Sequence, residues 1–130
     1  MTTSDVITKL RNAVMADSAI AAIVSNRIYL ERLPQKFVLP AMTYLPEFPE
    51  SDFTLPIQNL SLIFDAWSKN SLQVYDIMDA LEAMFGNKTS LDFDGLSIPI
   101  SRRGTLTMIT QTEENIYHAT ALYSLKYVKN

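Results

Sequence analysis

Two stretches near the N-terminus carry apolar residues at helical spacing. The first predicts a helix over residues 5–16, which we expect Ser4 to cap. The second predicts a short helix over residues 19–24 that ends at Ser25-Asn26. The apolar positions are Ile7, Leu10 and Val14 in the first helix and Ala19, Ile20, Ile23 and Val24 in the second. Together the two segments predict an N-terminal helical hairpin.

Alternation of apolar and polar residues then predicts three strands. The first begins at Ile28, and the second covers Ala41 to Leu45 and is stopped by Pro46, because proline donates no backbone hydrogen bond. The third covers residues 59–67 and shows the clearest alternation. Its predicted core face carries Leu60, Leu62, Phe64 and Ala66, and its other face carries Ser61, Ile63, Asp65 and Trp67.

A long helix and two hairpins are predicted in the second half. Residues 68–71 offer caps for a helix with apolar residues Val74, Ile77, Met78, Leu81, Met84 and Phe85, ended by Gly86. Asp94-Gly95 favours a type I′ turn between strands 90–93 and 96–101. Pro99 implies an edge position or a bulge in the second of these.

The second hairpin joins strands 105–110 and 116–128 around residues 111–115. Both faces of its last strand carry apolar side chains. One face has Tyr117, Ala119, Ala121, Tyr123, Leu125 and Tyr127, and the other has His118, Thr120, Leu122, Ser124, Lys126 and Val128. We therefore expect helices on one side of the sheet and another protein, such as a second copy of the chain, against part of the other.

These elements predict one α+β domain over residues 1–130, a mostly antiparallel β-sheet with the helical hairpin and the long helix packed on one face. The hydrophobic fraction of 48% fits a single core. The absence of cysteine suits a reducing compartment, and no stretch has the length and hydrophobicity of a membrane span. A net charge of -3 disfavours direct binding to nucleic acid.

No residue pattern specifies a catalytic, cofactor or metal site, and we expect the chain not to be an enzyme. His118 has no nucleophile motif beside it, so we interpret it as a surface or interface residue, with catalysis or pH sensing as the alternative. Asp92 to Gly95 resembles the start of a calcium loop but lacks the remaining ligands. The three carboxylates Asp76, Asp79 and Glu82 suit a solvated helix face.

Trp67 and the three tyrosines of the last strand are of types enriched in protein interfaces, although core packing explains each of them at least as well. Arg102-Arg103, expected between two strands, could bind an acidic partner surface. The predicted interface residues are Phe48, Phe53, Trp67, Arg102, Arg103, Tyr117, Tyr123 and Tyr127.

Several short sequence segments, in this order along the chain, resemble the tail-completion and tail-terminator family of long-tailed bacteriophages and prophages, the lambda U-like proteins. The match spans nearly the whole chain. After the N-terminal helix, the segments that carry the resemblance are Asp17-Ser18-Ala19-Ile20-Ala21-Ala22-Ile23-Val24, Asn26-Arg27-Ile28-Tyr29, Leu33-Pro34, Leu39-Pro40, Phe64-Asp65-Ala66-Trp67-Ser68 and the Arg102-Arg103 region before a terminal antiparallel strand.

The resemblance implies an α+β fold and a ring, typically of six subunits, that caps the head-proximal end of the tail tube and stops its polymerisation. The implied partners are further copies of the chain, the tail-tube protein and the head connector, first in the bacterial cytoplasm and then in the virion. The free chain could still be a monomer. Under this hypothesis residues 37–53 and 111–115 meet the tube or the connector.

Two other readings remain open. A non-catalytic oligomeric binding module would show a concave apolar pocket for a small molecule or peptide. A hydrolase would need paired carboxylates with raised pKa, for which Asp76 with Asp79 and Asp92 with Asp94 are the candidates.

Overall fold

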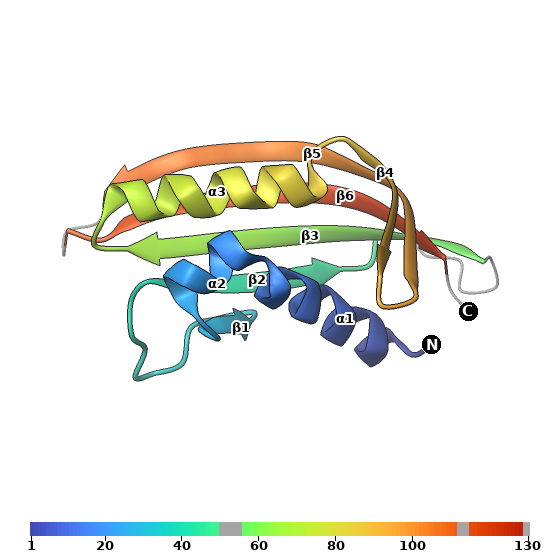
Figure 1. The fold of residues 1–130 in the computed structure, drawn as a ribbon, viewed down its shortest axis with the longest axis horizontal. Coiled ribbons are helices and arrows are strands. Elements are labelled where there is room, and N and C mark those ends of the chain that lie inside the picture. Colours follow the sequence, from blue (N-terminus) through green and yellow to red (C-terminus); the bar gives the residue numbers. More distant parts are fainter. Residues whose placement is uncertain (50–55, 112–114, 129–130) are drawn as a thin grey trace.

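The computed structural model describes residues 1–49, 56–111 and 115–128, and Figure 1 shows three helices on the same side of one β-sheet. The helices are α1 (Thr3–Ala16), α2 (Ser18–Val24) and α3 (Ser71–Phe85). The strands are β1 (Ile28–Leu30), β2 (Ala41–Glu47), β3 (Ile57–Ser68), β4 (Lys88–Phe93), β5 (Leu96–Gln111) and β6 (Tyr117–Val128). The α+β class and the position of the helices are as predicted.

The strand order across the sheet is β1-β2-β3-β6-β5-β4. β1 and β2 are parallel, and every other neighbouring pair is antiparallel, which confirms a mostly antiparallel sheet. β3 and β6 form the centre and pair without a register shift from Ile57–Val128 to Ser68–Tyr117. This long, regular pair is the platform on which the helices pack and from which the surface side chains project.

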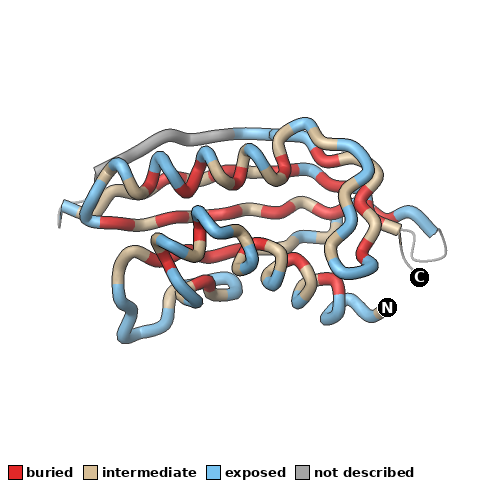
Figure 2. The backbone as a smooth tube through the Cα atoms, in the orientation of Figure 1, coloured by how far each residue is buried: buried red, intermediate tan, exposed pale blue. Residues whose placement is uncertain are grey.

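The period-two pattern of β3 and β6 determines the core. The predicted core face of β3 is buried, whereas Ser61, Ile63, Asp65 and Trp67 on the other face are only half-buried. In β6 the buried side chains are Ala119, Ala121, Tyr123, Leu125 and Tyr127. Figure 2 shows buried positions alternating along these strands and recurring along the helices. The core therefore lies between the central strands and the helix layer, as the alternation predicted.

Short polar side chains begin the helices, although not always at the predicted residue. Thr2, and not Ser4, caps α1: its hydroxyl accepts from the Asp5 backbone N–H at 3.1 Å, and the Asp5 carboxylate accepts from the Thr2 N–H at 2.8 Å. This reciprocal arrangement satisfies two free donors, so the helix begins at Thr3. The caps of α2 and α3 are Asp17 and Asn70, and Asn70 lies within the predicted cap segment 68–71.

β5 is one continuous strand, which corrects the prediction of two strands separated by a loop at Arg102-Arg103. Its register against β6 shifts twice, first directly after this arginine pair. A β-bulge accommodates an extra residue without ending the strand, and sequence periodicity alone does not reveal one. Gly104 lies at the first shift, where an added Cβ would be 3.2 Å from Leu122 Cγ. The glycine thus allows the two strands to stay paired.

Two prolines lie inside strands. β2 continues through Pro46, so the prediction that Pro46 stops the strand is wrong. β1 pairs with β2 only as far as Tyr44, and within the described residues no other strand borders β2 on that side at Pro46. Pro99 lies opposite Ser90, whose φ is +56°, and the two are not register partners. The predicted irregularity at Pro99 is therefore present.

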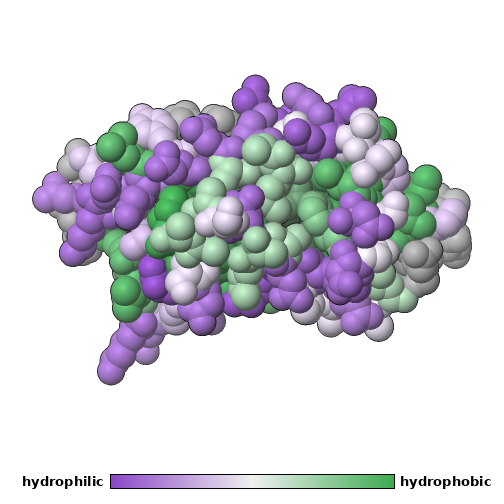
Figure 3. Space-filling view, viewed as in Figure 1, coloured by the Kyte–Doolittle hydropathy of each residue, from purple (hydrophilic) through white to green (hydrophobic). Residues whose placement is uncertain are grey.

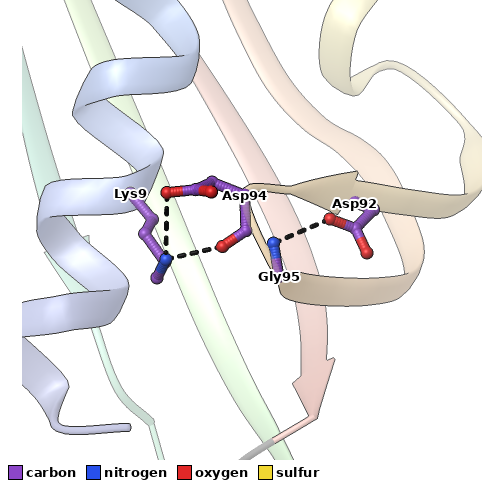
Figure 4. A network of polar contacts seen from close by, with 4 residues as sticks. All are labelled: Lys9, Asp92, Asp94 and Gly95. Carbon is purple, nitrogen blue, oxygen red and sulfur yellow. Dashed lines mark hydrogen bonds and ion pairs between the residues drawn. The ribbon is translucent and has the colours of Figure 1, made fainter.

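The turn between β4 and β5 has the predicted geometry and is fastened to α1. Asp94 and Gly95 both have positive φ, at 54° and 87°, as a type I′ turn requires. Asp92 Oδ1 accepts from the Gly95 N–H at 2.9 Å. Figure 4 shows Lys9 of α1 reaching the carbonyl and the carboxylate of Asp94, the latter at 3.2 Å. Asp92 and Asp94 therefore both make hydrogen bonds at the predicted type I′ turn.

Two arginines hold the helices to the short edge strand. Arg27 donates to the carbonyl of Pro40 at 2.8 Å and to that of Ile23 at 3.2 Å. Arg11 donates to the Ile28 carbonyl at 3.1 Å. These bonds join α1, α2, β1 and the start of β2, which gives the Asn26-Arg27-Ile28-Tyr29 segment a structural role.

Candidate interaction surface

The sheet side that faces away from the helices, here called the open face, carries both polar and apolar groups. Its central members are half-buried or exposed rather than fully covered. They are Ser61, Ile63, Asp65 and Trp67 of β3, and His118, Thr120, Leu122, Ser124 and Lys126 of β6. Within the described residues no helix packs on this face.

An aromatic and polar cluster lies at one end of the open face. The rings of Trp67 and His118 stack with centroids 4.8 Å apart and planes 6° apart. Asp65 Oδ1 lies 2.7 Å from His118 Nε2 and accepts from the Thr120 hydroxyl at 2.5 Å. Each side chain is thereby held in one orientation on a rigid strand pair, as an interface anchor requires.

The same geometry does not suit nucleophilic catalysis. A serine-type triad needs the carboxylate on one imidazole nitrogen and the hydroxyl on the other. Here Asp65 and Thr120 both approach Nε2 of His118, Thr120 at 3.4 Å. The Thr120 hydroxyl also donates to Asp65, so its proton is not directed at the imidazole. The cluster therefore fits the expected role of His118 as a surface or interface residue.

A groove of about 550 Å³ with basic side chains, here called the basic groove, occupies the other end of the open face. Arg102 of β5 and Lys126 of β6 both line it, and both are exposed. Apolar walls come from Pro49 and Ile100. Asn59, Ser61, Leu60, Ser124 and Leu125 complete the lining. The combination of apolar walls and cations suits an acidic, partly apolar protein surface.

A second recess, of about 620 Å³, lies where the segment before β2 meets the start of α3. Phe37 and Val38 line it from one side, with exposed fractions of 43% and 63%. Asn70 and Gln73 line it from the other side. Large apolar side chains are thus exposed at the beginning of segment 37–53, which was expected to meet the tube or the connector. Residues 50–53 of this segment, and residues 112–114 of the second expected segment, 111–115, lie outside the described residues.

The helix side of the molecule has a different surface. Figure 3 shows weakly apolar atoms across its middle, bordered by hydrophilic groups. A shallow groove of about 390 Å³ lies between α1 and the β4–β5 turn, where Ala13, Ala16 and Phe93 are its apolar lining and Lys9, Asn12, Asp92 and Asp94 its polar lining. The chain therefore offers apolar contact area on both sides of its sheet.

Two of the predicted interface residues are core residues of the chain itself. Tyr123 and Tyr127 are fully buried beneath the helix layer, the alternative that the sequence left open. The Tyr123 hydroxyl donates to Glu82 Oε2 at 2.9 Å, and Glu82 Oε1 lies 3.7 Å from Arg103 Nη1. Arg103 therefore projects to the helix side, whereas Arg102 projects to the open face, so the arginine pair does not form one basic patch.

The other predicted interface residues are distributed over the molecule. Trp67 belongs to the open-face cluster, and Tyr117 is half-buried one position before His118. Phe48 packs edge-on against Tyr127 with centroids 6.3 Å apart. Phe53 lies outside the described residues.

The carboxylates singled out from the sequence do not form a metal site. Asp76 and Asp79 are exposed on α3, and Glu82 is engaged by Tyr123. In residues 1–49, 56–111 and 115–128 no group of three or more potential ligands is placed to hold a metal ion. Over the same residues, no helix is both long enough and apolar enough to cross a membrane.

Burial and the hydrogen bond to Glu82 make the contribution of Tyr123 to the stability of the fold depend on pH in the alkaline range. Burial is the larger cause that raises the pKa of the Tyr123 phenol well above its ordinary 10.0, and the Glu82 hydrogen bond adds to it. Above pH 10 the unfolded chain loses this proton while the folded chain keeps it, so the free energy of unfolding falls as pH rises. Above pH 10, Tyr123 lowers the free energy of unfolding of the unchanged protein by up to about 1.4 kcal/mol per pH unit, and we expect Tyr123→Phe to lack this contribution.

At neutral pH the same variant should lose about 0.5–1.5 kcal/mol, because Glu82 loses a hydrogen-bond donor. Urea unfolding at pH 7, 10 and 11 measures both effects. Tyr75→Phe is the matched control, since Tyr75 is 41% exposed on α3. Equal pH slopes for Tyr123→Phe and the unchanged protein would contradict this account.

The sequence did not identify the partners of His118. Asp65 and Thr120 are register partners on adjacent strands, and His118 is their diagonal neighbour. Each strand's faces were assigned correctly, but the pairing of β3 with β6 was not predicted, and only that pairing brings the residues together. Leu72 and Tyr75, exposed on α3, were also missed because they lie off the apolar stripe that identifies the helix.

Comparisons with known proteins reveal similarity at the level of the fold. No protein-family model matches the chain, and no curated protein is similar to it in sequence. A solved chain described as "Virion of native gene transfer agent (GTA) particle" superposes with a TM-score of 0.66 at 12% identity, over 95% of this chain and 92% of its own. A second solved chain gives a TM-score of 0.59 at 12% identity, over 100% and 98%. The arrangement of helices and strands is therefore shared with solved structures over the whole chain.

Proposed function

We propose that the chain is a structural protein of a phage or phage-like particle that caps the head-proximal end of the tail tube. In this role it stops tube polymerisation and provides the surface to which the head is joined. The observation that carries the proposal is the whole-length similarity of the fold to a chain of a virion. The family that the sequence resembles has the same role, and it is the resemblance that favours this position in the particle.

The surfaces support an assembly role. A subunit of a cyclic ring needs two different, complementary surfaces, because each copy contacts the next one head to tail. The open face and the helix side provide two such surfaces on opposite sides of one rigid sheet. In this proposal the chain forms a hexameric ring on the tube. It is a monomer in free solution before it meets the tube.

The exposed recess at Phe37 and Val38 supports a contact with a further protein. Large apolar side chains at a chain surface are typical of sites that are covered on assembly. We assign this end to the tail-tube protein or the head connector. The proposed role needs no catalysis and no cofactor, and it places the chain in the bacterial cytoplasm during assembly and in the virion afterwards.

Light scattering tests the proposal. The mass of the purified chain is measured alone and with its candidate tail-tube protein, over a concentration series of both. A discrete species of hexamer size, formed alone or on the tube, is the expected result. A monomer or dimer that never associates with the tube protein would refute the proposal and favour the binding module.

A further inference from the structure

We propose that successive copies of the chain join by inserting the outer side of α3 of one copy into the basic groove of the next. The inference rests on the proposed function, because it names the two surfaces that would meet in the ring. The outer side of α3, here called the α3 ridge, comprises Leu72, Tyr75, Asp76 and Asp79.

The α3 ridge has the composition of a contact surface rather than of a solvated helix face. Leu72 is 68% exposed and Tyr75 is 41% exposed, although both are large and apolar. Asp76 lies one helical turn after Leu72, and Asp79 lies about one turn further on, so all four side chains project from the same side. The ridge therefore combines apolar bulk with two negative charges.

The carboxylates of the α3 ridge have no side-chain partner among the described residues, because neither the Asp76 nor the Asp79 carboxylate makes a hydrogen bond or ion pair there. Glu82, on the same helix, is instead used internally by Tyr123 and Arg103. Asp76 and Asp79 remain available for an intermolecular contact.

The basic groove has the complementary composition. The Arg102 guanidinium has no ion pair or hydrogen bond among the described residues, and Lys126 Nζ donates to Asn59 Oδ1 at 2.9 Å. Ile100 and Pro49 provide apolar walls beside these cations. A volume of about 550 Å³ accommodates side chains of the size of Leu72 and Tyr75. Opposite charges around an apolar centre would fix the register of the contact.

The two surfaces lie on opposite sides of the sheet. Ile100 and Arg102 pair with Lys126 and Ser124, which places the groove on the open face. The α3 ridge lies on the helix side (Figure 1). One copy cannot fill its own groove with its own ridge, and the contact between two copies leaves one free ridge and one free groove. Such a heterologous contact repeats from copy to copy and forms a ring when the rotation between successive copies closes, so a second copy of the chain is the occupant we assign to the groove.

Disulfide trapping tests the contact directly, because the chain contains no cysteine. A Leu72→Cys/Ile100→Cys variant, oxidised under the conditions in which the chain assembles, should give a ladder of covalent oligomers that ends at the ring. Leu72→Cys/Ser18→Cys is the control, since Ser18 is exposed at the start of α2, away from the groove. A ladder that is equally strong in the control, or absent from the test variant, would overturn the inference.

Charge reversal provides the second arm. Arg102→Glu and Asp79→Arg should each weaken self-association at least about tenfold, because each places like charges in the contact. The double variant Arg102→Glu/Asp79→Arg restores opposite charges at every contact and should recover assembly. Single variants that assemble normally and still cap the tube would overturn this contact while leaving the proposed function intact. A wild-type chain that neither assembles nor caps would overturn the function itself. Trapping of Ile100→Cys on the tube protein instead of on a second copy would also overturn the contact.

Discussion

Replacing Phe85 by alanine should lower the free energy of unfolding by about 3–5 kcal/mol. Phe85 is fully buried at the end of α3 and lies at the centre of an aromatic cluster. Its ring centroid is 5.5 Å from that of Phe64, 5.6 Å from that of Tyr123 and 5.8 Å from that of Phe93. Truncation removes contacts with β3, β4 and β6 at once and leaves a cavity between rigid strands that cannot close around it.

Urea unfolding of the purified variant measures the loss. Val38→Ala is the matched control, because Val38 is exposed in the segment before β2 and its truncation should change stability by less than about 0.5 kcal/mol. If the two variants were equally stable, the aromatic cluster would not be the centre of the core.

Replacing Gly86 by alanine should cost about 1–3 kcal/mol, although the residue follows a helix in ordinary backbone geometry. Its φ is -73°, which any residue can adopt, so the requirement is one of space. A Cβ at this position would lie 2.7 Å from the backbone oxygen of Glu82 and would also collide with the Glu82 carboxylate. The last turn of α3 would have to move, and the Glu82 hydrogen bond to Tyr123 would move with it.

Gly104→Ala is a graded comparison for this prediction. There the added Cβ would meet the Leu122 side chain at 3.2 Å and the Leu122 carbonyl oxygen at 3.3 Å, contacts that small shifts can relieve. Thermal unfolding of both variants should therefore show the larger decrease in melting temperature for Gly86→Ala. The opposite order would contradict the assignment of Gly86 as the tighter position.

Local sequence patterns predicted most of the elements because they report local physics. The apolar stripe of α3, the alternation in β3 and β6 and the turn at Asp94-Gly95 all follow from short-range rules, and each was located to within a few residues. The errors at Ser4 and Pro46 have local causes as well. Thr2 and Asp5 together form a capping box, and β2 tolerates a proline beyond Tyr44, where its pairing with β1 has ended.

The candidate surface was less predictable because it depends on strand order. Arg102 and Arg103 lie within the continuous strand β5, where the ordinary alternation of side chains puts them on opposite sides of the sheet. Likewise, the central pairing of β3 with β6 creates both the Trp67–His118 stack and part of the basic groove. The residue pattern along a single strand reveals neither the continuity of β5 nor the pairing of β3 with β6. Composition indicated interface-prone residues, but it did not distinguish buried Tyr123 from surface Trp67.

The length of tail tubes assembled from the purified tube protein tests the central proposal most directly. Electron micrographs are compared with and without the chain, with heat-denatured chain as a control for correct folding. The proposal predicts that the folded chain binds one end of each tube and stops its growth, so tubes become shorter as the ratio of chain to tube protein rises. An unchanged length distribution at every ratio, with no chain at the tube ends, would contradict it.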